Sequence, residues 1–317
     1  MKMLVRASIG TLAVLGLDCV PMLERPTTAY LLQYSRSGCM ASCAFCSQSA
    51  NCLTNKEYVS RIPWPKIELK SFIENLRESK HFSRICFQTV LKPDFEKEVL
   101  DFLRLIRADG VDLPVSIGTT PLKVETLEAM RRQGVDYLGV GLDTTPTCFK
   151  SIKGVFDYSD FFAFIERSVG IFGVKHVNVH LIFGLGESEV EFVNTMEKIY
   201  DMGAEVALFA FTPVRGTDME HVPQPRIERY RLMQIVRYLL SKGYPLNEIL
   251  SLGDGVGLRI DVDEDALKSS LLTSGCPGCN RPFYNERPGK IYNYPSLKLI
   301  ECDMEVIRKQ LNWGRGL

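Results

Sequence analysis

"HVNVHLIFGLGESEVEFVNTMEKIYDMG", residues 176–203, places a β-rich apolar run directly before a longer segment with helical character. The first part, 176–185, is typical of a strand buried in a parallel sheet, and the second part, 187–203, of the helix that covers it. Together they form one βα unit. The fold class then depends on how often this unit recurs along the chain.

Five further βα units are predicted, so six units follow one another. So many repeats of one unit favour a TIM-type (β/α) barrel, full or partial, within the α/β class. A doubly wound sheet stays an alternative, because strand order cannot be deduced from one sequence. The predicted strands are 29–35, 84–90, 114–120, 135–142, 176–185 and 205–213, and the predicted helices are 66–79, 95–108, 122–134, 157–173, 187–203 and 226–243.

The chain divides into three predicted parts: an N-terminal segment (1–28), the barrel (29–262) and a C-terminal extension (263–317). Residues 251–272 can supply another strand and helix, and a last helix is predicted at 305–313. Between them, 273–295 is rich in Pro, Gly, Asn, Tyr and Arg, which indicates an ordered loop. One catalytic domain with a C-terminal extension is the simplest partition.

Charge and composition exclude some partners and favour a compartment. Lys and Arg together number 38, as do Asp and Glu, so no net charge favours nucleic acid or an anionic membrane. We expect no transmembrane helix, because no apolar stretch approaches the roughly 20 residues required. Ten cysteines are too few for a disulfide scaffold and favour metal or catalytic chemistry in a reducing compartment. The chain is therefore predicted to be cytoplasmic.

The first 19 residues, "MKMLVRASIGTLAVLGLDC", superficially resemble a lipoprotein signal peptide. Asp18 directly before Cys19 disfavours a cleavage site, which requires small neutral side chains. Gly10 and Gly16 also dilute the apolar run. Secretion is therefore not expected.

The stretch "SGCMASCAFCSQS" (37–49) lies in the loop after the first predicted strand, where barrels build their active sites. Cys39, Cys43 and Cys46 have the spacing C-x3-C-x2-C, and their soft sulfur ligands favour iron–sulfur or zinc. Three ligands to a four-iron cluster leave one iron open for a substrate or cofactor. The alternative is a closed zinc or ferredoxin-type site that also uses Cys52, although the spacing matches neither ferredoxin pattern.

This motif, with the aromatic Phe45 before its last cysteine, resembles the radical S-adenosylmethionine (SAM) superfamily. The resemblance implies that the three cysteines hold a [4Fe–4S] cluster whose open iron binds SAM, and that Phe45 lies near the adenine. One-electron reduction then cleaves SAM to methionine and a 5′-deoxyadenosyl radical, which abstracts an unactivated hydrogen.

Two further motifs resemble those of biotin synthase. "GVDYLGVGLDTTP" (134–146) is similar to the strand whose Asp contacts the SAM ribose, which implies that role for Asp143. "HLIFGLGES" (180–188) is similar to a glycine-containing motif near the adenosyl group, which implies Ile182, Gly184, Gly186 and Glu187. Each motif alone is weak, since Asp143 can cap a helix and "GLGE" can simply be a tight turn.

The likeness to biotin synthase is incomplete. That family is expected to hold a second, [2Fe–2S] cluster through cysteines on neighbouring strands, and here only Cys86 falls at such a place. The strands at 114–120 and 176–185 contain no cysteine. Biotin synthesis is therefore doubtful, and Cys86 is interpreted as a core residue.

Cys276 and Cys279 lie instead in "SGCPGCNRPFYNERPG" (274–289), and half a zinc ribbon is the simplest interpretation of that spacing. Together with "LFAFTPVRGT" (208–217) and "YNYP" (292–295), this loop resembles the biotin-synthase-like lipoyl synthases that work as pairs of radical SAM proteins. The resemblance implies an auxiliary [4Fe–4S] cluster at the barrel mouth, a sacrificial sulfur donor. Its third ligand is predicted to be Cys19, with Cys302 as the alternative.

The implied reaction is radical sulfur insertion into an octanoyl chain bound to a carrier protein of the lipoyl-domain or H-protein type. A second radical SAM lipoyl synthase component and an electron donor are the implied partners. Another biotin-synthase-like enzyme, either biotin synthase itself or one that transfers sulfur or methyl to another substrate, is the first alternative. A non-enzymatic zinc-binding protein is the second. Leu181, Phe209 and Phe211 can line an apolar slot for the chain, and core packing is the alternative for these strand residues. Arg281 and Arg287, beside the cysteines, can order the loop or contact the carrier protein, and surface salt bridges are the alternative.

Overall fold

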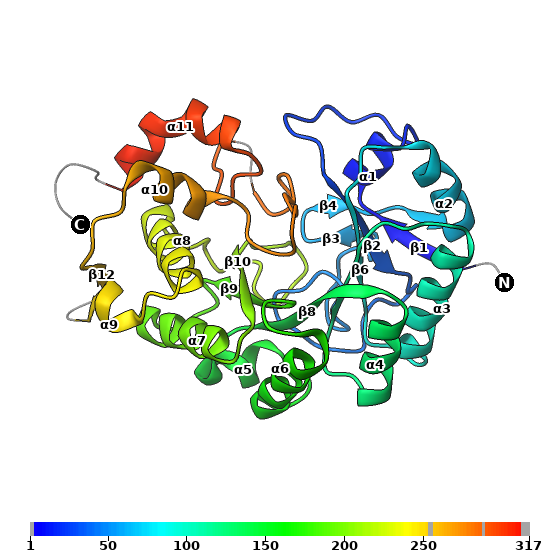
Figure 1. Ribbon diagram of the computed structural model, residues 1–317, viewed down its shortest axis with the longest axis horizontal. Coiled ribbons are helices and arrows are strands. Elements are labelled where there is room, and N and C mark those ends of the chain that lie inside the picture. Colours follow the sequence, from blue (N-terminus) through cyan, green and yellow to red (C-terminus); the bar gives the residue numbers. More distant parts are fainter. Residues whose placement is uncertain (1–2, 253–255, 287–288, 312–317) are drawn as a thin grey trace.

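Six parallel strands form the centre of the protein, in a computed structural model that describes residues 3–252, 256–286 and 289–311 (Figure 1). Within the sheet they follow chain order, each beside the strand before it, so the sheet is singly wound. A doubly wound sheet would reverse that order at a switch point, so this alternative is wrong. The six strands are β2 (Thr28–Gln33), β6 (Arg84–Gln88), β7 (Val115–Thr119), β8 (Val135–Asp143), β9 (Val177–Phe183) and β10 (Glu205–Ala210).

The TIM-type prediction is confirmed in its partial form. The complete order is β10-β9-β8-β7-β6-β2-β1-β5, and among the described residues no pairing joins β10 to β5. β1 (Leu4–Ala7) pairs antiparallel with β2, and β5 (Lys66–Glu68) pairs antiparallel with β1. The N-terminal segment therefore extends the sheet, and the cysteine loop follows the first parallel strand rather than the first strand of the chain.

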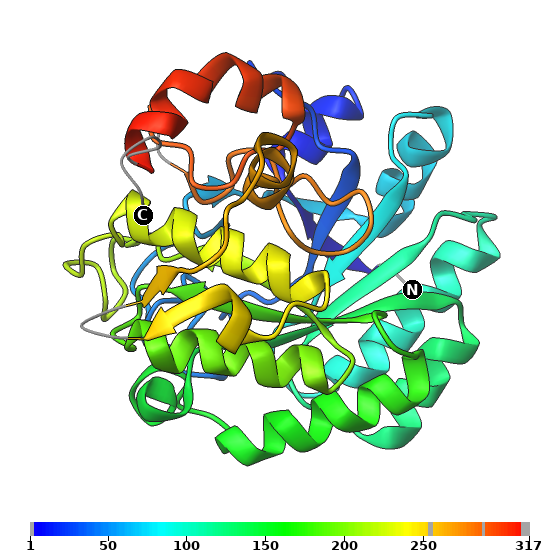
Figure 2. The same ribbon diagram turned by 60° about the vertical axis from the view of Figure 1, so that its left-hand side comes forward.

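Helices cover the outer face of the sheet (Figures 1 and 2). The predicted and observed bounds coincide for α3 (Phe95–Ala108), where Val99, Phe102 and Ile106 are buried on one side of the helix. No helix in the described ranges is long and apolar enough to cross a bilayer. The helices of the six units are α2 (Leu69–Glu78), α3, α4 (Val124–Arg132), α6 (Tyr158–Phe172), α7 (Glu189–Asp201) and α8 (Ile227–Ser241), with α5 (Pro146–Ile152) added after β8.

Alternation along β9 separates two environments. Val177, Val179 and Leu181 are fully buried in the core beneath the helices. Asn178, His180 and Ile182 line a cavity on the opposite, inner face of the sheet. Because successive strand residues point to opposite faces, Leu181 does not line the cavity, and of its two predicted roles the core position is the one observed.

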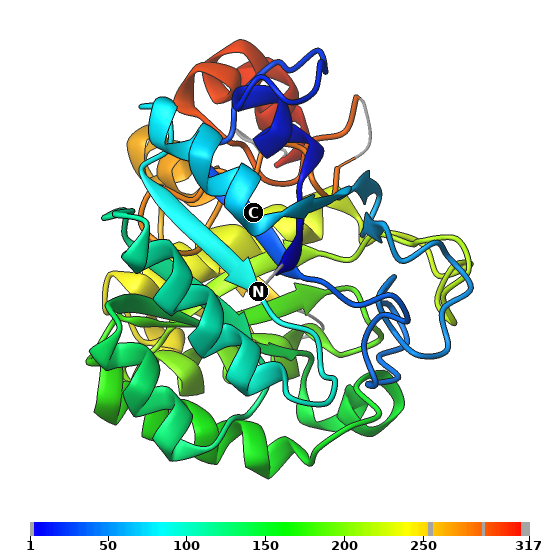
Figure 3. The same cartoon turned by 90° about the vertical axis from the view of Figure 1, so that its right-hand side faces the viewer.

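Short elements complete the N-terminal half. α1 (Ile9–Val14) packs beside β2, where Thr11 Oγ1 accepts a hydrogen bond from the Tyr30 backbone N–H at 3.0 Å. Figure 3 shows α1 on the same side of the molecule as the C-terminal helix. A small antiparallel pair, β3 (Tyr58–Val59) and β4 (Ile62–Pro63), follows the cysteine loop.

The C-terminal extension packs on α8. Arg231 of α8 is fully buried and donates hydrogen bonds to the carbonyl oxygens of Ile291 and Tyr292 at 2.5 Å. The strand predicted in 251–272 occurs as one side of a separate antiparallel pair. The remaining elements are α9 (Leu246–Ile249), β11 (Leu250–Leu252), β12 (Val256–Leu258), α10 (Glu264–Leu271) and α11 (Leu297–Gln310).

The loop between α10 and α11 bridges the two ends of the parallel series (Figure 1, orange). At one end, the backbone N–H of Leu208 in β10 donates to Ser274 Oγ at 2.8 Å. At the other, Thr27 Oγ1 donates to the Gly278 carbonyl at 2.5 Å, and Arg84 Nε to the Pro277 carbonyl at 3.3 Å. These contacts place the loop at the amino ends of β2 and β6, on the open side of the barrel.

Candidate functional site

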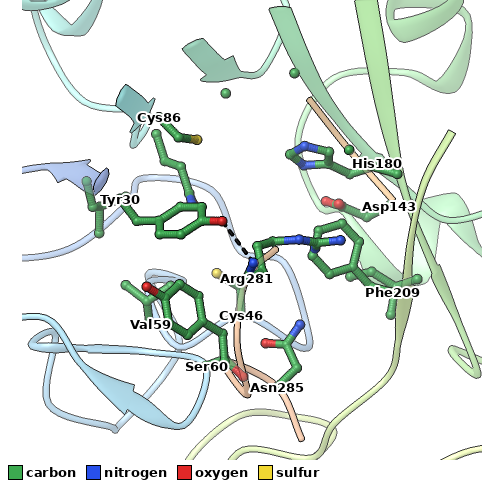
Figure 4. Close-up of a pocket in the computed structure, with 18 of the residues that line it drawn as sticks. Tyr30, Cys46, Val59, Ser60, Cys86, Asp143, His180, Phe209, Arg281 and Asn285 are labelled. Carbon is green, nitrogen blue, oxygen red and sulfur yellow. Dashed lines mark hydrogen bonds between the residues drawn. The ribbon is translucent and has the colours of Figure 1, made fainter. Parts of the chain in front are cut away.

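A single cavity of about 320 Å³ inside the sheet brings together residues from both cysteine motifs (Figure 4). Cys39 and Cys46 line it from the loop at the carboxyl end of β2. Cys86 lines it from the middle of β6, and Cys276 and Cys279 line it from the C-terminal loop. Ligand sites in proteins have volumes of roughly 300–1,000 Å³, so this cavity is large enough for a small ligand.

The loop that carries the first three cysteines is held by its own backbone. The Cys39 N–H donates to the Gln48 carbonyl at 2.7 Å, which closes the loop. Gly38 has φ +83°, and a Cβ there would lie 2.6 Å from that same oxygen, so only glycine fits. Cys39 Sγ accepts hydrogen bonds from the N–H groups of Ala41 and Leu91 at 3.4 and 3.2 Å, contacts that also suit a metal-bound thiolate.

The chemistry of these thiols fits an iron–sulfur cluster. Burial raises the pKa of Cys46 to about 12 and also raises the pKa of Cys43, against the opposing effect of Lys153. Such thiols become thiolates when a metal supplies positive charge. Among the described residues no three ligand side chains converge on one metal ion. A four-iron cluster has no such requirement, because each thiolate binds a different iron.

Asp143 lines the cavity at the carboxyl end of β8, where its backbone adopts φ +68°. Lys153 Nζ donates to Asp143 Oδ2 at 2.6 Å and to the Gly141 carbonyl at 2.7 Å. Burial alone lowers the pKa of Lys153, but Asp143 and Cys43 outweigh it, and the net shift is upward. Lys153 therefore stays charged beside the cysteine loop and fixes the Asp143 carboxylate. The sequence analysis missed this residue.

The "GLGE" turn after β9 is built for a sharp change of direction. Gly184 has φ +104°, and a Cβ there would lie 2.9 Å from Pro225 Cδ; Gly186 has φ +110°. Glu187 accepts hydrogen bonds from the N–H groups of Gly184 and Leu185 at 2.6 and 2.8 Å. Of the predicted SAM contacts, Phe45, Asp143 and Ile182 line the cavity. Gly184, Gly186 and Glu187 shape the turn beside it.

The second cysteine group lies toward the opposite end of the cavity. Cys276 Sγ accepts a hydrogen bond from Asn178 Nδ2 at 3.3 Å. Cys279 Sγ and Tyr30 Oη are hydrogen-bonded to each other, also at 3.3 Å. The loop thus enters at the amino ends of the strands, not at the barrel mouth that the sequence analysis expected. The reason is the anchoring of its backbone to Thr27 and Arg84.

The structure does not bring the predicted third ligand to this group. Cys19 is exposed after α1, and Cys302 is exposed on α11; neither lines the cavity. Their role as ligands stays a prediction without support from their positions. Arg287 lies outside the described residues.

Arg281 reaches into the cavity beside Phe209 (Figure 4). Its guanidinium lies 3.7 Å from the centroid of the Phe209 ring, and Nη2 donates to the Ser274 carbonyl at 2.7 Å. Its backbone N–H donates to Tyr30 Oη at 2.9 Å. The predicted cavity contacts of Phe209 and Phe211 are confirmed by the lining residues. A half-buried cation in the cavity is suited to an anionic group.

His180 on β9 also faces the cavity and was missed by the sequence analysis. Its ring packs against Phe209 and the neighbouring Gly139, whose missing side chain leaves the room. Burial, opposed by Asp143 and assisted by Arg281 and Lys153, lowers the pKa of His180 to about 4. The imidazole is therefore neutral at pH 7.

This burial predicts a specific loss of stability in acid. An unfolded histidine has a pKa of about 6.5, so below that pH the unfolded chain binds a proton at this residue whereas folded His180 does not. At pH 5 the unfolding free energy is expected to be about 2 kcal/mol lower than at pH 7.5 from this group alone. Urea unfolding of the iron-free protein across this range measures the loss. His180→Asn should show a shallower slope, and equal slopes would contradict the buried neutral imidazole.

An incomplete parallel barrel with three cysteines in the loop after its first parallel strand defines an iron–sulfur enzyme built on a βα scaffold. The chain belongs to the radical SAM superfamily, whose profile matches residues 35–199. Membership implies a [4Fe–4S] cluster and SAM as cofactors. The cysteine loop, Asp143 and the turn after β9 all lie within the matched region.

Curated relatives are biotin synthases at low identity. The chain is 22% identical to a biotin synthase of Ehrlichia canis over 81% of its length and 76% of the relative. A biotin synthase of Coxiella burnetii is 24% identical over 86% of the chain and 83% of the relative. One from Ralstonia nicotianae is 29% identical over 81% and 68%. The chain is therefore biotin-synthase-like.

Solved structures agree in fold. Methylornithine synthase superposes with a TM-score of 0.52 at 14% identity, over 68% of this chain and 63% of the other. A hydrogenase maturase from Carboxydothermus hydrogenoformans gives 0.52 at 14%, over 68% and 52%. The chain thus spans less than two thirds of either structure, and the likeness concerns the fold alone.

Proposed function

We propose that this enzyme inserts sulfur into a protein-bound octanoyl chain, in synthesis of the lipoyl cofactor. The observation that carries the proposal is the position of two cysteine groups at different ends of one cavity. One group, at the carboxyl ends of the strands, is that of the radical SAM cluster. The other, containing Cys276 and Cys279, is suited to hold an auxiliary cluster as the sulfur source.

In this proposal the cofactors supply the chemistry and the protein supplies placement. When bound and reduced, the first cluster and SAM would supply a 5′-deoxyadenosyl radical to take one hydrogen atom from the alkyl chain for each sulfur inserted; the carbon radical would then bond a sulfide of the auxiliary cluster, whose iron would accept the odd electron. Asp143, held by Lys153, is placed to bind the ribose hydroxyls. Phe209 and Phe211 provide an apolar wall for an alkyl chain.

The shared lining of the cavity also supports the proposal. A carbon radical must meet its sulfur donor before it meets solvent, and a cavity lined by both cysteine groups keeps the two within reach. Buried Trp64 and Tyr30 form part of the same wall. The reduced clusters are suited to the reducing compartment predicted for the chain, the cytoplasm.

The partners follow from the same proposal. The substrate is an octanoylated carrier protein of the lipoyl-domain or H-protein type. A second radical SAM lipoyl synthase component would insert the other sulfur, and an electron donor would reduce the clusters.

The testing experiment is incubation of reduced, iron-reconstituted protein with SAM and an octanoyl-lysyl peptide, alone and with a candidate partner. We expect 5′-deoxyadenosine to form and the peptide mass to rise by one or two sulfur atoms. Reconstituted protein should contain about eight irons per chain, as two four-iron clusters require. Zinc with little iron would favour the zinc-binding alternative and contradict the proposal.

A second candidate is biotin synthesis or another sulfur or methyl transfer of the biotin-synthase type. The observation in its favour is similarity to biotin synthases over 81% of the chain. The residues on two cavity-facing strand positions count against it. Ser116 of β7 and Asn178 of β9 line the cavity, where cysteines would be expected in a biotin synthase. Sulfur gain by a biotin precursor, and none by the octanoyl peptide, would decide for this candidate.

A further inference from the structure

Cys86 faces the cavity rather than the core. Its neighbours Ile85 and Phe87 are fully buried under the helices, whereas Cys86 and Gln88 line the cavity from the inner face of β6. The sequence analysis interpreted Cys86 as a core residue because it behaves as a small hydrophobe. Strand alternation places its thiol on the other face. Figure 4 shows it in the same cavity as Arg281.

The sheet register and hydrogen bonds bring Cys86 and the C-terminal loop to one part of the cavity. Cys86 of β6 is paired with Tyr30 of β2, and Tyr30 Oη is hydrogen-bonded to Cys279 Sγ at 3.3 Å. Cys86 and Cys279 pack against the same apolar cluster, and Cys276 lines the same cavity. Three thiols that share a cavity with the Arg281 guanidinium are suited to an anionic metal cluster.

The loop that carries Cys276 and Cys279 is anchored by bonds that need no metal. The Asn280 side chain joins this loop to the segment before β2: it accepts a hydrogen bond from the Thr27 N–H at 3.1 Å and donates one to the Arg25 carbonyl at 2.8 Å. Asn178 and Tyr30 hydrogen-bond the two sulfur atoms directly. The geometry of the site is therefore fixed before any cluster binds, which favours assembly there.

Three buried polar atoms of residues that line this cavity have no hydrogen-bond partner among the described residues: Trp64 Nε1, Asn178 Oδ1 and Arg281 Nε. Unpaired buried polar atoms are rare and indicate a missing partner. Arg281 Nε is a donor, which suits the inorganic sulfides of a cluster.

We propose that Cys86, Cys276 and Cys279 together hold the auxiliary iron–sulfur cluster, so that the barrel wall supplies the third thiolate in place of Cys19. The inference rests on the auxiliary cluster of the proposed function and specifies its ligands. Cys19 is exposed and does not line the cavity, and its backbone N–H donates a hydrogen bond to Asp18 Oδ1 at 2.7 Å. With three protein thiolates, a four-iron cluster keeps one iron without a cysteine ligand.

The test uses full-length protein in which Cys39, Cys43 and Cys46 are all replaced by alanine, so that iron binding reports the auxiliary site alone. After anaerobic reconstitution this variant should hold about four irons per chain and give an electron paramagnetic resonance signal when reduced. Adding Cys86→Ala should lower the iron at least fourfold and remove the signal. Adding Cys19→Ala should change neither.

The opposite pattern, in which Cys86→Ala keeps the iron and Cys19→Ala loses it, would overturn the ligand assignment and leave the proposed function standing. If the starting variant itself binds no iron, the auxiliary cluster and the proposed function fail together. Should Cys86→Ala fail to fold by circular dichroism, the near-isosteric Cys86→Ser takes its place. Its loss of iron with unchanged unfolding temperature supports the proposal, and retained iron overturns it.

Discussion

Cys43→Ala is expected to abolish SAM cleavage, so that 5′-deoxyadenosine falls below detection. Cys43 is turned toward the Lys153 carbonyl, with Sγ at 3.4 Å from that oxygen, while Cys39 and Cys46 line the cavity. Its removal therefore leaves the cavity wall intact and takes away one of three cluster ligands. Iron should fall from about eight to about four per chain, because the auxiliary cluster remains. Chromatography of the reaction products and iron analysis measure the two effects.

The matched control is Cys52→Ala, in the same loop. Cys52 is buried, and its Sγ accepts a hydrogen bond from the Thr54 N–H at 3.4 Å. Its replacement should cost about 1 kcal/mol of unfolding free energy and leave SAM cleavage in place. Loss of the radical cluster in Cys52→Ala would instead support the four-cysteine alternative that the sequence leaves open. SAM cleavage by Cys43→Ala would contradict the three-cysteine assignment.

The barrel could be predicted because its signals are local. Each parallel strand is a short β-rich run, and each helix repeats its apolar residues on one face, as Val99, Phe102 and Ile106 do in α3. β1 was missed for the opposite reason. It lies in the stretch that superficially resembles a signal peptide, whereas in the structure its Arg6 is buried and Nη1 donates to the Trp64 carbonyl at 3.2 Å. That contact joins residues far apart in sequence.

The same distinction divides the site. The spacing of Cys39, Cys43 and Cys46 is local, so one short loop was enough to predict a cluster. The group around Cys276 depends on how the C-terminal loop crosses the strands, and the spacing of cysteines along the sequence does not predict that path. Cys86 therefore looked like a core residue, and exposed Cys19 looked like a ligand. Periodicity identified the strand that carries Cys86 but not the face on which its side chain lies.

Cys279→Ala is expected to separate the two halves of the reaction. Cys279 lies in the C-terminal loop, hydrogen-bonded to Tyr30 Oη, and does not belong to the loop that carries Cys39 and Cys46. SAM cleavage should therefore continue, while sulfur gain by the octanoyl-lysyl peptide should stop. Product chromatography gives the first quantity and peptide mass the second, in the same reaction.

Cys302→Ala provides the matched control, because Cys302 is exposed on α11 and was the alternative ligand. It should keep both cleavage and sulfur gain. Loss of SAM cleavage in Cys279→Ala would mean that the C-terminal loop supports the first cluster. Continued sulfur gain would mean that sulfur reaches the substrate from outside this group. Cleavage without sulfur gain requires that radical formation and sulfur supply depend on different residues, as expected when two cysteine groups face one cavity from different ends.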